Sequence, residues 1–207
     1  MIGPFARRAA RALGTAIAVV ALATAGARAA APTPSAGEMA LGDPRAPVTV
    51  VEYGSVGCPH CAEWANDVFP EFRHKYVDTG KARFVFREML TGNGALAAAG
   101  FLTARCAAPD KYFQVIDDVF ARQAEIGRVG AKALIEIAAH AGVGEDHLMA
   151  CLKDDAALKA LTARTEADAK AHGVESTPTF FVNDKRLDGD NTLENLEAAI
   201  ARPRRGH

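Results

Sequence analysis

The sequence lacks a large excess of charge, and it lacks an apolar run long enough to cross a bilayer. Its 207 residues include 24 basic and 25 acidic side chains, which gives a formal net charge of −1. This balance gives no reason to expect a nucleic acid or an anionic membrane surface as partner. The apolar run at 13–25 is shorter than the roughly 20 residues that a spanning helix needs. We therefore expect a soluble globular protein with a sizeable core.

Residues 1–29 have the pattern of a signal peptide. Arg7, Arg8 and Arg11 precede the apolar run, and Ala27-Arg28-Ala29 is the small-x-small pattern that signal peptidases cut after. The prediction is export to the periplasm with cleavage near Ala29. A retained membrane anchor is the alternative, and the short run disfavours it. The Arg7-Arg8 pair also allows twin-arginine export.

The sequence has only four cysteines, and all four lie beyond the predicted signal peptide. Disulfides form and persist outside the cytosol, so an exported chain can use cysteines in pairs. Cys58 and Cys61 are three residues apart, whereas Cys106 and Cys151 are far apart in sequence. The two spacings indicate two pairs with different roles. No cysteine lies near the predicted cleavage site, which disfavours a lipoprotein anchor.

The sequence lacks residues that a haem or zinc site at Cys58 and Cys61 would need. A c-type haem needs a histidine directly after the second cysteine, and Ala62 stands there. Zinc would need two further ligands, and the sequence has no second Cys-x-x-Cys. We therefore expect no metal and no cofactor, and we expect the pair to be redox-active. A zinc site and a purely structural bridge remain the alternatives.

The hydrophobic pattern predicts an α/β fold with a mostly helical insertion. The order implies a strand–helix–strand unit with parallel pairing and a right-handed crossover. The predicted elements are strands at 48–53, 83–88 and 179–182, helices at 59–77 and through most of 94–172, a hairpin turn at Asn183-Asp184 into 185–187, and a last helix capped by Thr192. The predicted divisions are a signal peptide (1–29), an N-terminal arm (30–47), the first half of the core (48–91), a helical insertion (92–156), the second half of the core (157–203) and a tail (204–207).

Cys58-Pro59-His60-Cys61 lies where the first predicted strand passes into the first predicted helix. The unpaired N–H groups and the positive end of the helix dipole favour an anion there, which would be the Cys58 thiolate. A helix N-terminus in good geometry stabilises an anion by up to about 2 kcal/mol. A larger decrease in the thiol pKa would need His60 as a cation or donor. A stabilised thiolate favours the reduced pair, so it makes the disulfide a stronger oxidant.

Two further positions are candidates for the same site. Pro178 directly precedes a predicted strand, and a cis bond after Thr177 would turn the Thr177 backbone toward an approaching peptide. An ordinary trans loop proline is the alternative. Glu52 lies on the first strand, where burial would raise its pKa and let it exchange a proton with Cys61 through water. A solvated carboxylate at the strand end is the alternative for Glu52.

Cys106 and Cys151 are predicted to form a structural disulfide within the helical insertion. Both lie in apolar surroundings, and neither has the helix-start setting of Cys58, so neither is expected to be a reactive thiol. The alternative is two separate buried thiols that behave as small apolar side chains.

Three motifs together resemble the DsbA family. They are Gly42-Asp43-Pro44-x-Ala46-Pro47-Val48, the Val-Glu-Tyr-Gly-Ser-x-x-Cys-Pro-His-Cys run that ends at Cys61, and Ser176-Thr177-Pro178-Thr179-Phe180-Phe181-Val182. The resemblance covers about residues 38–203. It implies a thioredoxin-like fold with a helical insertion domain and an oxidase of reduced exported client proteins. It also implies a membrane quinone reductase of the DsbB type as re-oxidant.

Carried over by position, the resemblance assigns four roles. Cys58 would be the nucleophile, Cys61 the resolving thiol, Pro178 the cis-proline that binds substrate together with Thr177, and Glu52 the buried acid. Thr177 differs from the valine of the best-known oxidases and also occurs in isomerase branches. A disulfide isomerase or reductase is therefore the first alternative, although residues 30–47 are too few for the dimerisation domain of those branches. We expect a monomer. A non-catalytic periplasmic module that binds a metal or a client is the second alternative.

Overall fold

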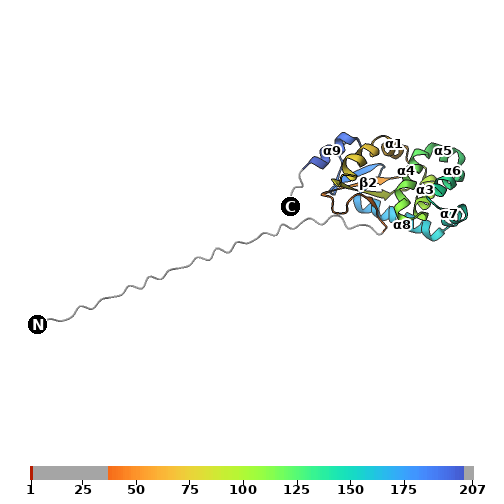
Figure 1. Ribbon diagram of the computed structural model, residues 1–207, viewed down its shortest axis with the longest axis horizontal. Helices are drawn as coiled ribbons and strands as arrows, with labels where there is room; N and C mark the ends of the chain where they lie inside the picture. Colours follow the sequence, from red (N-terminus) through yellow and green to blue (C-terminus); the bar gives the residue numbers. More distant parts are fainter. Residues whose placement is uncertain (2–36, 203–207) are drawn as a thin grey trace. The chain divides into compact units, whose positions relative to one another are not determined.

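The computed structural model describes Met1 and residues 37–202, which centre on a five-stranded mixed sheet (Figure 1). The strand order is β1-β3-β2-β4-β5. Strands β2 (Val48–Gly54) and β3 (Ala82–Glu88) are parallel, which confirms the predicted crossover unit. Strands β4 (Thr179–Val182), β5 (Lys185–Arg186) and β1 (Met39–Leu41) are each antiparallel to their neighbours. The predicted signal peptide and C-terminal tail lie outside the described residues.

Strand β1 was not expected, and the prediction of a loose arm is wrong for residues 39–41. The Met-Ala-Leu stretch contains no β-branched residue, so its sequence carries no strand signal. It becomes a strand by pairing with β3, in register from Met39 opposite Phe86 to Leu41 opposite Phe84. The strand therefore arises from tertiary contact, because β3 would otherwise expose unpaired N–H and C=O groups at the sheet edge.

The helix predicted over 59–77 is interrupted near Val68. It consists of α1 (Pro59–Asp67), α2 (Phe69–Phe72) and a π-helical turn, η1 (Arg73–Val77). Pro70 causes the interruption, since proline has no N–H to donate and its ring clashes with the carbonyl four residues earlier.

The remaining helices form the insertion and the flanks of the sheet. Side chains cap three of them at the N-terminus, namely Asn93, Asp154 and Thr192, and the last of these confirms the predicted cap. The helices are α3 (Gly94–Cys106), η2 (Pro109–Lys111, a 3₁₀ turn), α4 (Tyr112–Ala121), α5 (Gln123–Val129), α6 (Ala131–His140), α7 (Glu145–Leu152), α8 (Asp155–His172) and α9 (Leu193–Ala201). Within the described part of the chain, no helix combines the length and apolarity needed to cross a membrane.

Strand β2 lies at the centre of the fold and is buried on both faces. Val50 packs into the larger core with Phe84, Phe86 and Phe180, whereas Val51 belongs to a smaller cluster on the opposite face. A central strand covered on both faces carries its C-terminal end deep into the protein. The loop that follows β2 therefore starts from a rigid position.

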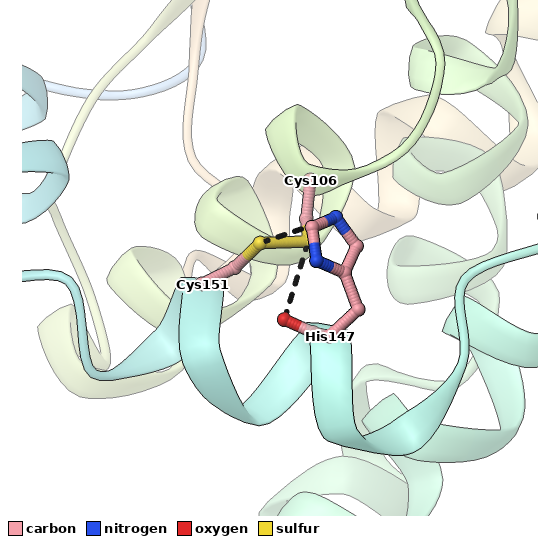
Figure 2. Close-up of side chains that lie close together, drawn as sticks. All are labelled: Cys106, His147 and Cys151. Atoms are coloured by element: carbon pink, nitrogen blue, oxygen red, sulfur yellow. Dashed lines mark hydrogen bonds between the residues drawn. A yellow bond between two sulfur atoms is a disulfide. The ribbon is translucent and has the colours of Figure 1, made fainter.

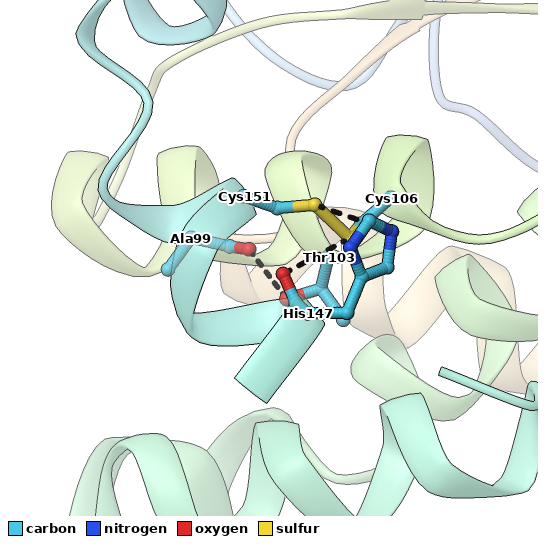
Figure 3. The surroundings of a disulfide bond; sticks show 5 residues. All are labelled: Ala99, Thr103, Cys106, His147 and Cys151. Atoms are coloured by element: carbon cyan, nitrogen blue, oxygen red, sulfur yellow. Dashed lines mark hydrogen bonds between the residues drawn. A yellow bond between two sulfur atoms is a disulfide. The ribbon is translucent and has the colours of Figure 1, made fainter. Parts of the chain in front are cut away.

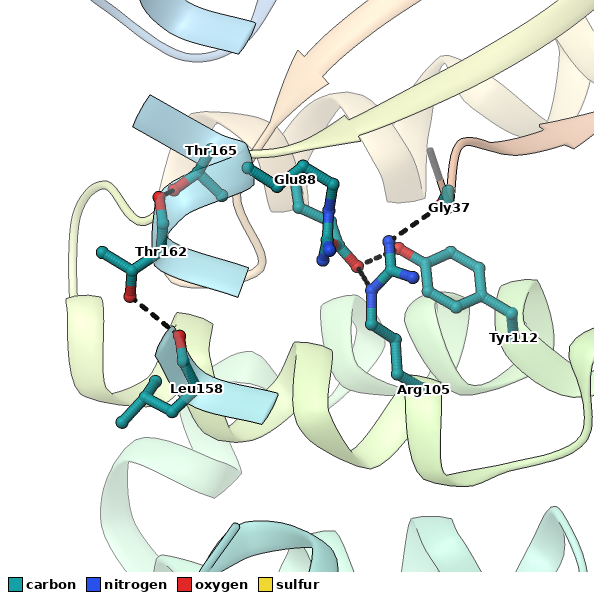
Figure 4. Close-up of polar contacts among 8 residues, drawn as sticks. Gly37, Glu88, Arg105, Tyr112, Leu158, Thr162 and Thr165 are labelled. Carbon is teal, nitrogen blue, oxygen red and sulfur yellow. Dashed lines mark hydrogen bonds and ion pairs between the residues drawn. The ribbon is translucent and has the colours of Figure 1, made fainter. Parts of the chain in front are cut away.

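A buried carboxylate joins the sheet to the insertion. Glu88, at the end of β3, accepts hydrogen bonds from Arg105 Nε at 2.6 Å, Arg164 Nη2 at 2.6 Å and the Tyr112 hydroxyl at 2.9 Å. Figure 4 shows Arg105 and Tyr112 converging on Glu88, with Arg105 also reaching the carbonyl of Gly37. Two arginines compensate the buried charge, so these contacts hold α3, α4 and α8 against the end of β3.

Candidate active site

The loop between β2 and α1 is held against the loop between β3 and α3 by a close backbone approach. A Cβ atom at Gly57 would lie only 2.3 Å from the carbonyl oxygen of Asn93. The amide of Asn93 donates to the Gly57 carbonyl at 2.9 Å. Only glycine fits this approach, and it fixes the position of the residue that follows, Cys58.

Cys58 is the N-cap residue of α1, and Pro59 occupies the first helical position. The Cys58 side chain is only 7% exposed, and its thiol donates to the carbonyl of Thr177 at 3.4 Å. Burial raises the pKa of this thiol, but hydrogen bonds from the Thr177 side chain and from Cys61 and the His60 backbone outweigh it. The pKa of Cys58 is therefore lower than that of an ordinary cysteine thiol, as expected for a sulfur at the start of a helix.

Cys61 lies one turn further along α1 and has the opposite setting. Its side chain is fully buried, and its sulfur accepts the backbone N–H of Ser55 at 3.4 Å. Burial, reinforced by the nearby Glu52 carboxylate, raises the pKa of Cys61 well above its ordinary value. The structure holds both cysteines as free thiols. At neutral pH Cys61 is therefore a thiol, whereas Cys58 is the member poised to ionise.

The peptide bond between Thr177 and Pro178 is cis, and it brings the Thr177 carbonyl to the Cys58 sulfur. The Thr177 hydroxyl lies 2.6 Å from the hydroxyl of Thr91, on the loop after β3. Asn191 Nδ2 donates to the carbonyl of Pro178 at 3.2 Å. The Pro178 loop is thus fixed from both sides beside the cysteine pair.

Two residues of this site were not found from the sequence. The Ser55 backbone contacts Cys61, and its hydroxyl donates to the carbonyl of Thr91 at 2.9 Å. Ser55 and Thr91 therefore connect the Cys58–Cys61 turn to Thr177. Ser55 belongs to one of the motifs noted above, but Thr91 lies in a polar loop with no pattern that would single it out.

His60 and Glu52 differ in how closely they approach the cysteines. The His60 side chain is exposed, and its backbone, not its ring, contributes to lowering the Cys58 pKa. Glu52 is only 2% exposed, and its pKa is raised well above the ordinary value by burial and then by Cys58. Oε1 of Glu52 has no hydrogen-bond partner among the described residues. The buried setting predicted for Glu52 is confirmed, and it is more complete than expected.

Cys106 and Cys151 are joined by a disulfide that links the last residue of α3 to α7. Their Cα atoms are 6.1 Å apart, within the range that a disulfide spans. Figure 2 shows His147 beside the bond, with its carbonyl facing Cys106 and its ring facing Cys151. These three side chains lie close enough to hold a metal ion, but both sulfurs are already bonded to each other. The disulfide therefore leaves only the histidine as a ligand.

Sequence comparison places residues 34–202 in a family described as thioredoxin. A protein of Rickettsia bellii, provisionally named a protein-disulfide oxidoreductase, is 34% identical over 79% of this chain. The match spans 63% of that relative, so the chain covers less than two thirds of its length. Disulfide bond formation protein D of Bacillus subtilis is 28% identical over 79% of this chain and 78% of its own.

A solved structure agrees with these relatives. The crystal structure of α-DsbA1 from Wolbachia pipientis superposes with a TM-score of 0.72 at 25% identity, covering 81% of this chain and 90% of that one. This chain is therefore similar to these proteins in sequence and in fold. It has a mixed sheet, a cysteine pair at the start of α1 and a cis-proline loop opposite that pair. The chain belongs to the thioredoxin family, in its DsbA branch.

Proposed function

We propose that this protein is a thiol:disulfide oxidoreductase that introduces disulfides into exported proteins, with Cys58 as nucleophile and Cys61 as resolving thiol. The observation that carries the proposal is the contrast between the two thiols. Hydrogen bonds lower the pKa of Cys58 below its ordinary value despite burial, whereas burial raises that of Cys61. A stabilised Cys58 thiolate favours the reduced pair, which makes the disulfide form ready to be passed on.

The reaction starts from a Cys58–Cys61 disulfide. A client thiolate attacks Sγ of Cys58, the Cys58–Cys61 bond breaks, and a client–Cys58 mixed disulfide forms. Cys61 leaves as a thiolate and takes up a proton, because its buried position disfavours charge. The second client thiolate then attacks the client sulfur, and Cys58 leaves as a thiolate. The client loses two electrons and gains a disulfide, and the Cys58–Cys61 pair gains two electrons.

Thr177 and Pro178 are the proposed substrate-binding pair. The Thr177 carbonyl lies 3.4 Å from the Cys58 sulfur, and Thr177 and Pro178 are both partly exposed. A client peptide that reaches Cys58 must therefore pass beside this backbone. Glu52 is the proposed proton donor and acceptor for Cys61, because both groups are buried and the Glu52 charge contributes to the raised pKa of Cys61.

The setting of the reaction is part of the proposal. Residues 1–29 would direct export to the periplasm, and residues 92–156 would form the helical insertion between the two halves of the core. Reduced exported proteins would be the clients, a membrane quinone reductase of the DsbB type would reoxidise the pair, and the protein would act as a monomer. The similarity to Disulfide bond formation protein D supports a role in making disulfides.

Two cysteine variants test the roles. Cys58→Ser should abolish both the oxidation of reduced ribonuclease and the reduction of insulin. In Cys61→Ser the Cys58 thiolate can still attack a client disulfide and release one client thiolate, and the resulting mixed disulfide should accumulate on non-reducing gels because Cys61 is not there to resolve it. Equal trapping of clients by the two variants would contradict the assignment of nucleophile and resolving thiol.

A disulfide isomerase or reductase is the second candidate, and Thr177 before the cis-proline is the observation that favours it. The equilibrium reduction potential of Cys58–Cys61 against glutathione separates the candidates. An oxidase should remain largely reduced in a glutathione buffer that leaves a thioredoxin-like reductase oxidised. A non-catalytic metal-binding module is tested by thiol titration with and without a chelator, since a chelator should change nothing in a redox enzyme.

A further inference from the structure

A small cavity lies beside the buried acid of the site, between β2, α1 and α4. It is mostly aromatic, but Glu52, Trp64 and Asp117 also line it. The cavity volume is ≈ 10 Å³, which is room for about one water molecule, provided that polar groups are there to bind it.

Two polar side-chain atoms of residues that line this cavity are buried and have no partner among residues 37–202. They are Oε1 of Glu52 and Nε1 of Trp64. The side chains are 2% and 4% exposed, so solvent does not reach them from elsewhere. A buried acceptor and a buried donor without partners are each costly, and a bound water molecule is the usual way in which such groups are satisfied.

Two of the residues that line the cavity are partly exposed. They are Ala65 on α1 and Asp117 on α4, and the other lining residues are buried. The Asp117 side chain is 45% exposed, so it lines the cavity and also meets solvent. Arg73 Nη1 approaches its carboxylate at 3.9 Å. Asp117 is therefore the polar group at the mouth of an otherwise apolar passage to Glu52.

We propose that Asp117 relays protons between solvent and Glu52 through water held in this cavity, so that Cys61 can gain or lose its proton during disulfide exchange. The inference rests on the proposed function, because it supplies the proton that the departing Cys61 thiolate requires. Asp117 acts through Glu52 and does not touch the reacting sulfurs.

The proton balance is complete within the chain and solvent. When Cys61 leaves as a thiolate, Glu52 gives it a proton and becomes a buried carboxylate. The bridging water gives Glu52 a proton, Asp117 replaces the proton on the water, and solvent reprotonates Asp117. Reoxidation runs the same path in reverse. Glu52 and Asp117 line the same cavity, so water in it would carry the proton between them without its crossing the aromatic wall.

Asp117 titrates in the range where a relay is useful. Burial raises its pKa to about 6, while Arg73 lowers it and the neighbouring Asp118 raises it to smaller extents. Of the other charges nearby, Arg73 is shared with Asp78 at 3.5 Å, and Glu52 faces the same cavity. Near neutral pH both forms of Asp117 are available, as a group that accepts and donates protons in turn requires.

The test is Asp117→Asn compared with Asp118→Asn. Asp118 is the adjacent carboxylate on α4 and does not line the cavity. The oxidised protein is mixed with dithiothreitol across a pH series, and the reaction is followed by the fluorescence of Trp64, the single tryptophan. A positioned acid–base group contributes about 10²–10⁴-fold, and Glu52 remains in the variant, so we expect about 10-fold slower exchange in Asp117→Asn. The inflection near pH 6 should also disappear.

Three further readouts separate a relay from a structural effect. Reduction and reoxidation should slow by the same factor, which leaves the reduction potential unchanged. Small weak acids in the buffer should restore the rate, because they carry protons to the open mouth. In a Glu52→Gln background, Asp117→Asn should have no additional effect, since the two groups act in series.

Asp117→Asn rates and pH profiles equal to those of Asp118→Asn would overturn the relay while leaving the proposed function intact. So would a slower exchange that weak acids fail to rescue. Wild-type protein that exchanges no disulfide would instead refute the proposed function. Folding does not obscure the result: the folded-state pKa of Asp117 is raised, so its ionised form disfavours the fold at neutral pH, and asparagine removes that charge.

Discussion

Removal of the Cys106–Cys151 disulfide should destabilise the protein without removing its redox chemistry. The bond links residues 45 apart in sequence, from the end of α3 to α7. A disulfide that closes a loop of this length lowers the conformational entropy of the unfolded chain. In the chain-entropy relation, this stabilises the folded state by about 4 kcal/mol at 25 °C. The half-buried positions of both cysteines mean that two alanines would leave only small gaps. We therefore expect Cys106→Ala/Cys151→Ala to lower the free energy of unfolding by about 3–4 kcal/mol.

The packing around the bond indicates that α3 keeps its fold when the disulfide is removed. Figure 3 shows the disulfide beside Thr103, whose hydroxyl donates to the carbonyl of Ala99 within α3 at 2.8 Å. This contact lies within α3, which is helical up to Cys106, and it does not involve the sulfurs. The double variant should fold, and it should pass disulfides at the parent rate.

Urea unfolding followed by circular dichroism measures the effect. For a urea slope of about 2 kcal/mol per molar, the midpoint should fall by roughly 2 M. As a control, the parent and the double variant are compared in excess reductant, where their midpoints should match because neither protein then holds a disulfide. Peptide mapping should show a 106–151 linkage that survives mild reduction of Cys58–Cys61. A double variant that unfolds at the parent midpoint would refute the reasoning, as would free thiols at both positions in oxidised protein.

Three other substitutions test the contacts around the site. Glu88→Gln should lower the free energy of unfolding by about 2–4 kcal/mol, measured in urea, because it takes the charge from a buried carboxylate between two arginines. Thr177→Val should raise the Cys58 pKa, seen as a thiolate absorbance that appears at higher pH, and should make the disulfide less oxidising. His60→Ala should leave that titration nearly unchanged, since the backbone N–H that faces Cys58 remains in the variant.

Each of these three predictions has a contrary outcome. For Glu88, the matched control is Glu125→Gln, which weakens a more exposed pair with Arg122 and should cost less than about 1 kcal/mol. If the free energy of unfolding falls by the same amount in both variants, burial does not strengthen the contribution of the Glu88 ion pairs to stability. If Thr177→Val titrates in the same way as the parent protein, the Thr177 hydroxyl does not lower the Cys58 pKa. A clear rise in that pKa in His60→Ala would mean that the imidazole ring acts on the sulfur after all.

Features with a local signal were predictable from the sequence. The β-branched run of β2, the turn at Asn183-Asp184 and the Thr192 cap each depend on neighbours within a few residues. In the structure both turn residues have positive φ, as the tight hairpin predicted there requires. The placement of Cys58 at a helix start was equally local, because it follows from a strand signal, a proline and the periodicity of α1.

The rest depends on contacts between distant segments, for which one sequence carries no pattern. Strand β1 forms because it pairs with the edge of β3. Thr91 belongs to the site because its hydroxyl contacts the hydroxyl of Thr177, which is 86 residues away in sequence. In the sequence alone, Asp117 is an ordinary polar residue on an amphipathic helix. Its position at the mouth of the Glu52 cavity appears only when α4 is packed against β2 and α1.

The insertion also contributes directly to the geometry of the redox turn. Gln123, at the start of α5, donates through Nε2 to the carbonyls of Val56 at 2.9 Å and of Cys58 at 3.1 Å. A Cβ at Gly100 on α3 would lie 2.7 Å from Val56 Cγ2, so α3 also packs tightly against this turn. The backbone that presents Cys58 is therefore held by the thioredoxin core on one side and by the insertion on the other. Since the lowered pKa of Cys58 depends on the orientation of nearby N–H groups, a change in the insertion can alter the redox properties of the pair without any contact to sulfur.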